Sequence, residues 1–469
     1  MIPMTLGAVA ETTGGRLHGC SPEEAAILLV DSPVVTDSRE AGPGSLYIAR
    51  VGEQADGHDF IPGAAKGGAV AALTTREVDG LPAVVVEDEQ AAFVALARHL
   101  VDSRPDLTVI GITGSSGKTS TKDLLGAVLD ADGETVAPQG SYNSEVGVPL
   151  TVCRVTPSTR HLVVEMGARG IGHIEYLTRI APPRIGIVLN VGHAHVGEFG
   201  SVEAIARAKS ELPAALPQAG VAVLNADDPL VAAMATGLAA EVVLVGEAEE
   251  ADVRATEVVL DEAGRPSFTL IAPFGTAAVS LDLVGRHHVG NALAVIAAAH
   301  AAGLELDTIL TALATARPVS RWRMEVTTRE DGVVVVNDAY NANPDSMSAA
   351  LRSVAAMATP GRRWAVLGEM LELGDDSAVL HAQVGAEAAE LGFDEVLVVG
   401  PGASPIAEGA GADDYSTAGP RVRVVADADA AEEILRTDLD ARDVVVLKSS
   451  RDAGLRWLGD RIVQREART

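Results

Sequence analysis

An apolar strand that runs into a glycine-rich turn at 111–120 leaves few folds open to this chain, and the turn reads GITGSSGKTS. The apolar residues 107–113 predict the strand, and residues 119–130 predict a helix after the turn. In such a unit glycines let backbone N–H groups surround phosphate oxygens, and the helix N-terminus adds the positive end of its dipole. The sequence therefore predicts a nucleoside triphosphate site, with Lys118 on the β- and γ-phosphates and the Thr119 hydroxyl on Mg²⁺.

The length of 469 residues and the 47% share of hydrophobic residues predict a folded chain of about three domains. We expect them at 1–104, 105–316 and 317–469. In the first, short apolar runs at 45–49, 69–73 and 83–86 alternate with Gly and Pro turns, as in a small α/β domain.

Apolar strands alternate with helical stretches in the other two expected domains. Strands at 161–165, 184–190 and 221–225 indicate that the central domain is a P-loop ATPase-like parallel sheet covered on both faces. The last domain is expected to be a separate, doubly wound Rossmann-like domain. Its expected strands are 333–337, 364–367, 395–399 and 444–447, and its expected helices are 347–357, 379–391 and 454–465.

Charge and cysteine content limit the class of protein. The net charge of −29 and the lack of a basic patch argue against binding to nucleic acid. Two cysteines, Cys20 and Cys153, are too few for a disulfide framework, so we expect a reducing, cytoplasmic location. The N-terminus has no leader-like pattern, and the apolar stretch 292–302 is short and interrupted by His300, so we expect no membrane segment.

Lysine is scarce, because arginine has replaced it nearly everywhere. It occurs only at positions 66, 118, 122, 209 and 448. Arginine cannot replace lysine at a site that needs a compact ammonium or a free amine. We therefore expect functions for Lys118, Lys209 and Lys448, and simple surface positions for Lys66 and Lys122.

Polar side chains follow several of the expected strands. Glu165, His193, His195 and Asp338 come directly after apolar runs, where ligands bind in open parallel sheets. Each could also be a helix cap or a surface group. Glu165 suits Mg²⁺, whereas a histidine is a softer ligand, so physical chemistry alone does not select His195.

A set of motifs along nearly the whole chain resembles the Mur ligase family, whose members are ATP-dependent amide-forming enzymes of peptidoglycan precursor synthesis. The family's T-G-x-x-G-K-T loop fits residues 113–119, which the common G-x-x-x-x-G-K-[ST] pattern does not. The resemblance implies the three-domain architecture of the family. The other motifs lie at 36–39, 44–49, 141–150, 165–168, 190–195, 208–211, 285–292, 323–325, 337–347, 367–374 and 448–451.

The resemblance also implies roles for individual residues. The nucleotide would contact Gly114, Ser115, Ser116, Gly117, Lys118, Thr119, Ser120, Asn291, Arg323, Asp338, Asn341 and Asn343. The metal and catalytic set would be Lys118, Thr119, Glu165, His195 and Lys209, with Lys209 carbamylated by CO₂ to give an anionic ligand for a second Mg²⁺. The other substrates would contact Ser38, Arg39, Asn143, Lys448 and Arg451. His287 and His288 are either packing residues or part of the site.

The activity that the resemblance implies is ligation of D-alanyl-D-alanine to UDP-MurNAc-tripeptide through an acyl phosphate, by a monomer with ATP and Mg²⁺. At two places the sequence departs from the family's motifs, and each departure weakens the prediction of one substrate contact. The family's Lys-Gly-Ser-Arg is Lys-Ser-Ser-Arg at 448–451, and the loop at 141–145 has less asparagine than in many relatives.

Other functions remain open at this point. A family member that adds a diamino acid to UDP-MurNAc-dipeptide usually carries Asp-Asn-Pro-Arg, which is missing here. A folylpolyglutamate synthase fits residues 337–347 poorly. A nucleotide-dependent binding switch would not need the set of Glu165, His195 and Lys209.

Overall fold

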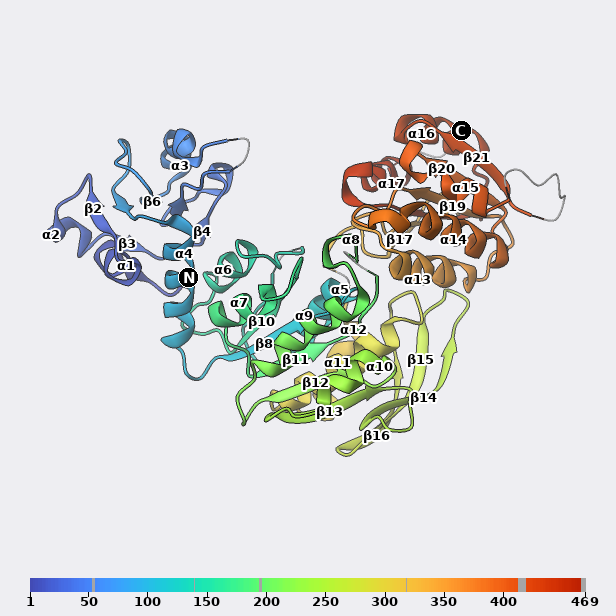
Figure 1. Cartoon of the computed structure of the whole chain (residues 1–469), viewed down its shortest axis with the longest axis horizontal. Coiled ribbons are helices and arrows are strands. Elements are labelled where there is room, and N and C mark those ends of the chain that lie inside the picture. The colour runs from blue at the N-terminus through green and yellow to red at the C-terminus, as the bar shows by residue number, and fades with distance from the viewer. Residues whose placement is uncertain (53–54, 139, 194–195, 318, 412–418, 465–469) are drawn as a thin grey trace.

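The computed structural model shows three α/β bodies in a row, and it describes residues 1–469 except 53–54, 139, 194–195, 318, 412–418 and 465–469 (Figure 1). The N-terminal body lies at one end, the central body in the middle, and the C-terminal body at the other end. The predicted three-domain α/β architecture is confirmed. Every helix among the described residues is too short or too polar to cross a bilayer.

The N-terminal body contains a small mixed sheet. Its strand order is β2 (Arg16–His18), β7 (Ala83–Val85), β6 (Ala71–Thr74), β5 (Leu46–Ile48) and β4 (Val34–Val35). A separate pair joins β1 (Met4–Thr5) to β3 (Leu29–Val30). Helices α1 (Leu6–Thr13) and α4 (Glu89–Asp102) pack together, and α4 also packs on α6 (Gly147–Val152) and α7 (His173–Ile180) of the central body. One hydrophobic core therefore runs from the N-terminal body into the central body.

The central body is built on a nine-stranded sheet. Its order is β16 (Gly275–Ser280), β15 (Pro266–Ala272), β14 (Val253–Leu260), β13 (Glu241–Gly246), β12 (Val221–Asn225), β11 (Ile185–Val188), β8 (Thr108–Thr113), β10 (His161–Glu165) and β9 (Thr135–Val136). Helices α5 (Lys118–Leu129), α11 (His288–Ala301) and α12 (Leu306–Thr315) share a core with one face of the sheet, while α6, α7 and α9 (Val202–Ala214) contribute to the core on the other.

The central sheet departs from the predicted parallel arrangement at one edge. Strands β14, β15 and β16 pair antiparallel, which makes the sheet mixed. Buried and exposed residues alternate along them, as in sheets that face water on one side. They therefore lack the continuous apolar runs that identified the parallel strands.

The C-terminal body has a six-stranded sheet in the order β17 (Glu325–Thr328), β18 (Val334–Asn337), β22 (Val444–Lys448), β19 (Arg363–Gly368), β20 (Glu395–Val399) and β21 (Arg421–Val425). Only β17 is antiparallel. Helices α13 (Pro344–Ala355), α14 (Ser377–Glu390) and α15 (Pro405–Gly409) cover one face, and α16 (Ala428–Asp438) and α17 (Leu455–Val463) cover the other. The strands and helices predicted here are confirmed to within a few residues at each end.

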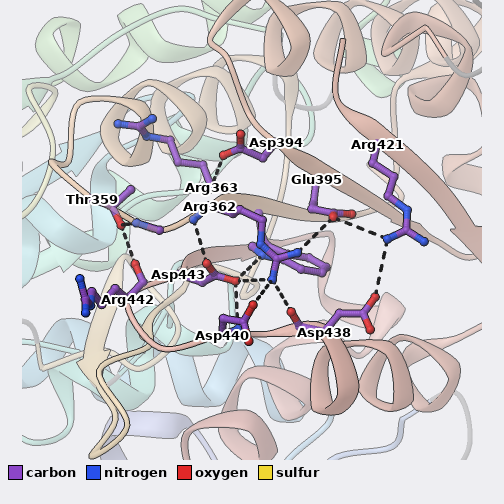
Figure 2. Close-up of polar contacts among 12 residues, drawn as sticks. Thr359, Arg362, Arg363, Asp394, Glu395, Arg421, Asp438, Asp440, Arg442 and Asp443 are labelled. Atoms are coloured by element: carbon purple, nitrogen blue, oxygen red, sulfur yellow. Dashed lines mark hydrogen bonds and ion pairs between the residues drawn. The ribbon is translucent and has the colours of Figure 1, made fainter. Parts of the chain in front are cut away.

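Charged side chains crowd the amino ends of β19, β20, β21 and β22 (Figure 2). Asp443 accepts from Arg362 N–H at 2.8 Å, from Arg362 Nη2 at 2.9 Å and from the Trp364 indole at 2.9 Å. Glu395 accepts from Arg423 at 3.0 Å, and the guanidinium groups of Arg362 and Arg423 lie 5.0 and 5.2 Å from the Trp364 ring centroid. We call this set, which also includes Arg421, Asp438 and Asp440, the amino-edge cluster.

A buried ion pair on α5 holds the linker between the central and C-terminal bodies. Asp123 accepts from Ser320 N–H at 2.8 Å and from its hydroxyl at 3.1 Å. Lys122 pairs with Asp123 and donates to Ser320 Oγ at 3.1 Å and to Pro138 O at 2.7 Å. The expectation of a surface position is therefore wrong for Lys122, which is 1% exposed, and confirmed for Lys66. Sequence spacing does not reveal a partner 198 residues away.

Candidate active site

A cavity of about 210 Å³ lies where the central and C-terminal bodies meet. One wall is the glycine-rich turn after β8 with Glu165 at the end of β10, and the other is the loop after β18 with the end of β22. Both walls are carboxyl ends of parallel strands, where open α/β sheets bind ligands. The predicted site residues that line it are Ser115, Ser116, Gly117, Lys118, Thr119, Ser120, Asn143, Glu165, Asn291, Arg323, Asp338, Asn341, Asn343 and Lys448.

The turn between β8 and α5, which we call the phosphate loop, is held in one conformation by close packing and hydrogen bonds. Gly117 has a φ of 80°, and a Cβ there would lie 2.9 Å from Asn291 Oδ1 on α11, so only glycine fits easily. Asn190 Oδ1 accepts from Ser116 N–H at 2.9 Å, and Asn190 Nδ2 donates to Ser116 O at 3.2 Å. The loop is thus fixed at the N-terminus of α5, where free N–H groups favour an anion.

Lys118 is the first residue of α5 and folds back onto the phosphate loop. Its Nζ donates to Gly114 O at 2.6 Å. Burial lowers the pKa of this ammonium, the Glu165 carboxylate opposes the shift, and Arg323 adds to it. A phosphate group in the cavity would stabilise the charged amine.

Glu165 ends β10 with its side chain fully buried. Its Oε2 accepts from the Thr119 hydroxyl at 3.0 Å. Its Oε1 accepts from Ser141 Oγ at 2.9 Å and from Asn143 Nδ2 at 2.8 Å. Asn143, predicted to contact substrate, therefore also orients the carboxylate that faces the phosphate loop.

The groups at the phosphate loop fit Mg²⁺. This ion prefers oxygen ligands and commonly takes one or two carboxylates together with phosphates and waters. The Thr119 hydroxyl and the Glu165 carboxylate both border the cavity and lie 3.0 Å apart. The described residues contain no cluster of three or more His, Cys, Asp or Glu side chains suited to a metal. Phosphates and waters commonly supply the rest of the coordination of Mg²⁺.

On the opposite wall, Lys448 and Asp338 form a buried ion pair. Lys448 Nζ donates to Asp338 Oδ2 at 2.5 Å, to Asn341 O at 3.1 Å and to Asp338 O at 3.3 Å. Burial lowers the pKa of Lys448, the Asp338 carboxylate opposes this shift, and Arg323 adds to it. The predicted substrate residue Lys448 thus shares the cavity with the predicted nucleotide residues.

Arg323 reaches the cavity from a strained segment of the linker. Its two neighbours, Trp322 and Met324, have φ values of 59° and 49°, a region that bulky residues rarely occupy. Glu325 accepts from Trp322 N–H at 2.9 Å, and Asp338 accepts from Met324 N–H at 3.0 Å. Asp338 therefore has a structural task that sequence reasoning missed, since backbone strain leaves no mark in residue spacing.

Arg323 also stacks on an aromatic ring at the edge of the cavity. Its guanidinium lies 4.2 Å from the Tyr340 centroid, and that of Arg451 lies 5.9 Å from the same ring. Arg451, predicted to bind substrate, is outside the cavity lining but next to Tyr340, which belongs to it. Tyr340 received no role from the sequence, although it lies within the motif at 337–347.

The two predicted asparagines after β18 differ in their surroundings. Asn343 is buried and caps α13, because its Oδ1 accepts from Ser346 N–H at 2.8 Å. Asn341 is exposed and borders the cavity. The predicted approach of both to a γ-phosphate stays a prediction.

Lys209 lies on α9 and is not among the residues that line the cavity. It is 5% exposed, and its side chain makes no hydrogen bond or ion pair within the described part of the chain. Burial and, to a smaller extent, the nearby charge of Lys118 lower its pKa to about 7. His195 falls outside the described residues.

Other predicted residues lie elsewhere or had no assigned role. Ser38 and Arg39 form part of a short 3₁₀ helix in the N-terminal body, where Arg39 pairs with Asp37 at 2.5 Å. His287 borders the cavity and His288 is buried behind it, with ring centroids 4.2 Å apart. Burial lowers the pKa of His287 to about 4, which keeps it neutral.

Family models match three successive parts of the chain. They are described as the catalytic domain of the Mur ligase family at residues 32–100, the Mur ligase middle domain at 112–299 and the Mur ligase glutamate ligase domain at 322–451.

Full-length relatives agree with these models. UDP-N-acetylmuramoyl-tripeptide–D-alanyl-D-alanine ligase of Mycobacterium tuberculosis is 47% identical, over 99% of this chain and 98% of the relative. A crystal structure of MurF from Acinetobacter baumannii aligns with a TM-score of 0.86 at 30% identity, over 99% of both chains. MurF from Thermotoga maritima, in complex with ADP, aligns with a TM-score of 0.78 at 28% identity, over 94% of this chain and all of that one.

Proposed function

This chain belongs to the Mur ligase family, and from that premise we propose that it is the ligase that joins D-alanyl-D-alanine to UDP-MurNAc-tripeptide at the expense of ATP. The observation that carries the proposal is the single cavity shared by the phosphate loop and the Asp338–Lys448 wall. A nucleotide and an acceptor held there would meet between two domains. The products are UDP-MurNAc-pentapeptide, ADP and phosphate.

The proposed nucleotide residues are those that line the cavity around the phosphate loop. Lys118 and the N–H groups at the N-terminus of α5 bind the phosphates, while Asn291, Arg323 and Asp338 hold the rest of the nucleotide. Thr119 and Glu165 would hold Mg²⁺, which when bound would offset phosphate charge and polarise the γ-phosphoryl group. His195 is proposed as a further metal residue on sequence grounds only.

The proposed chemistry proceeds in two displacements. A carboxylate oxygen of the tripeptide attacks the γ-phosphorus, and the bond to the β-phosphate oxygen breaks, giving an acyl phosphate and ADP. The neutral amine of D-alanyl-D-alanine then attacks the acyl carbon, loses a proton and expels phosphate. Lys118 and Lys448 stabilise the negative charge that gathers in this cavity, and the facing domains exclude water from the acyl phosphate.

Lys209 is proposed to react with CO₂. Only a neutral amine can attack CO₂, and a pKa lowered to about 7 provides that form at neutral pH. The amine nitrogen forms a bond to the carbon of CO₂ and releases a proton, and the resulting anionic carbamate would supply oxygen ligands for a second Mg²⁺. We expect Lys209→Ala to lower turnover at least a hundredfold and short carboxylic acids to restore part of it. An unchanged rate in this variant would remove the carbamate from the mechanism.

The decisive experiment supplies ATP, Mg²⁺, UDP-MurNAc-tripeptide and D-alanyl-D-alanine to the purified protein and measures the nucleotide pentapeptide by mass spectrometry. Product formation that stops with EDTA and with Lys118→Met is the expected result. Product only with UDP-MurNAc-dipeptide and a diamino acid would transfer the function to that earlier ligase step. Nucleotide binding with no ligation of either pair would indicate a binding switch.

Further properties belong to the same proposal. Ser38 and Arg39 of the N-terminal body contact the uridine diphosphate end, and Asn143, Lys448 and Arg451 contact the peptide parts. The domain boundaries are proposed at 104/105 and 316/317. The protein is proposed to act as a monomer in the cytoplasm, where ATP and nucleotide-linked precursors are made.

A further inference from the structure

A contact between domains lies directly beside the phosphate loop. Asp345 is in the first turn of α13 in the C-terminal body, and its Oδ2 accepts from His193 N–H of the central body at 2.8 Å. Its other oxygen lies 3.4 Å from His193 Nδ1. Gly192 is so close that a Cβ on it would lie 2.1 Å from Asp345 Oδ2. The segment of Gly192 and His193 therefore packs closely against the Asp345 carboxylate.

The same segment is bonded to the phosphate loop on its other side. Gly192 N–H donates to Ser115 Oγ at 2.8 Å, and Ser115 Oγ donates to Gly192 O at 3.3 Å. Two residues earlier, Asn190 bonds to the backbone of Ser116 through both its side-chain groups. An unbroken series of hydrogen bonds thus joins α13 of one domain to the phosphate loop of the other.

We propose that Asp345 is a positioning residue that couples docking of the C-terminal domain to the geometry of the phosphate loop, through His193 N–H, Gly192 and Ser115. A carboxylate bond to a backbone N–H is stronger than a neutral one, and it directs a single approach of α13. The turnover part of this inference rests on the proposed ligase function, whereas the docking part does not.

Two substitutions separate the hydrogen bond from the charge. Asp345→Ala removes the acceptor, and we expect kcat to fall about tenfold with KM for UDP-MurNAc-tripeptide changed less than twofold. Asp345→Asn keeps an oxygen that can accept from His193 N–H, so we expect kcat within threefold of the parent. Equal kcat values for Asp345→Ala and the parent would overturn the proposal.

Gly192→Ala offers an independent route to the same contact. Its new methyl group would push Asp345 away without changing any charge, and Gly192 does not require a left-handed backbone. We expect this substitution to slow turnover in the parent and to add little in the Asp345→Ala background, because both changes break one contact. Full additivity in the double variant would contradict the coupling.

Docking is measured without ligation. Spin labels at Gln218→Cys and Glu433→Cys, both exposed, report the distance between the domains once the half-buried Cys20 is replaced by serine. When a non-hydrolysable ATP analogue is added, we expect the distribution of distances between the labels to narrow in the parent. The Asp345→Ala variant should need an at least fivefold higher concentration of the analogue for the same narrowing. Identical titrations in both would overturn the proposal, even in a protein with no ligase activity. Equal thermal melting of both proteins controls for folding.

Discussion

Lys209 is unfavourable to folding in its charged form, because the fold removes its ammonium from water. Its pKa in the folded chain is about 7, against a usual value of 10.5. Between these pH values the unfolded chain binds the extra proton, so the free energy of unfolding rises with pH across this window. Below pH 7 the full cost applies.

We therefore expect Lys209→Met to raise the free energy of unfolding by about 4 to 5 kcal/mol at pH 6–7 in CO₂-free buffer, since the pKa shift is about 3.5 units. The gain should shrink towards zero as the pH approaches 10, and urea unfolding at a series of pH values measures it. Lys66→Met, at an exposed position, is the matched control and should show no such trend. A gain that stays constant with pH would contradict the shifted pKa.

At the scale of single residues, sequence reasoning found groups with unusual chemistry but not their supporting contacts. Lys118, Glu165 and Lys448 could be predicted, because a phosphate loop, a strand-ending carboxylate and scarce lysines each leave a local signal. Ser141 holds Glu165 from a loop 24 residues away, and Asp123 holds Ser320 from 197 residues away. Such pairs depend on tertiary packing, which no local pattern records.

Among the secondary-structure elements, the strands of the C-terminal sheet have a different task at each end. Their carboxyl ends carry Asp338 and Lys448 into the cavity, whereas their amino ends carry the amino-edge cluster (Figure 2). Asp443 is the centre of that cluster, since it is 1% exposed and accepts four hydrogen bonds from Arg362, Trp364 and Asp440.

We expect Asp443→Ala to lower the free energy of unfolding of the C-terminal body by about 3 kcal/mol, because it leaves buried donors unpaired. Turnover at a temperature where the variant is folded should stay within twofold of the parent, since the cluster lies at the edge opposite the cavity. Asp440→Ala, whose side chain is 84% exposed, is the control and should cost less than about 1 kcal/mol. A loss of kcat without a loss of stability would contradict this division.

The elements themselves were predictable where burial is complete. Fully buried strands such as β10 and β20 read as largely apolar runs, and their predicted bounds match those observed. The hairpins of β14, β15 and β16 were missed, because half-exposed strands mix polar and apolar residues. Linker geometry was also missed, since the left-handed backbone at Trp322 and Met324 occurs without glycine.

At the scale of the whole molecule, the distribution of the hydrophobic cores predicts fewer cooperative unfolding units than domains. The N-terminal and central bodies share one hydrophobic core through α4, α6 and α7, while the C-terminal body has one core on each face of its sheet, of which one also includes Val284 of the central body. All three tryptophans, Trp322, Trp364 and Trp457, lie after residue 316. Tryptophan fluorescence therefore reports on the C-terminal body alone.

We expect two unfolding transitions, and the one seen by fluorescence should differ in midpoint from the larger change in far-UV circular dichroism. A nucleotide at a hundred times its dissociation constant should stabilise the bodies that form the cavity by about 2.7 kcal/mol and bring the midpoints together. Uridine diphosphate should raise the midpoint of the circular dichroism transition more than that of the fluorescence transition. Coincident curves without any ligand would contradict the division into two units.

The distribution of lysine also has a practical consequence. Of the five lysines, only Lys66, on α3 (Ile61–Gly67) of the N-terminal body, is exposed. An amine-directed surface coupling would therefore tether the molecules chiefly through this one point. On a sensor chip they would share one orientation, with the nucleotide cavity between the two bodies that are not tethered.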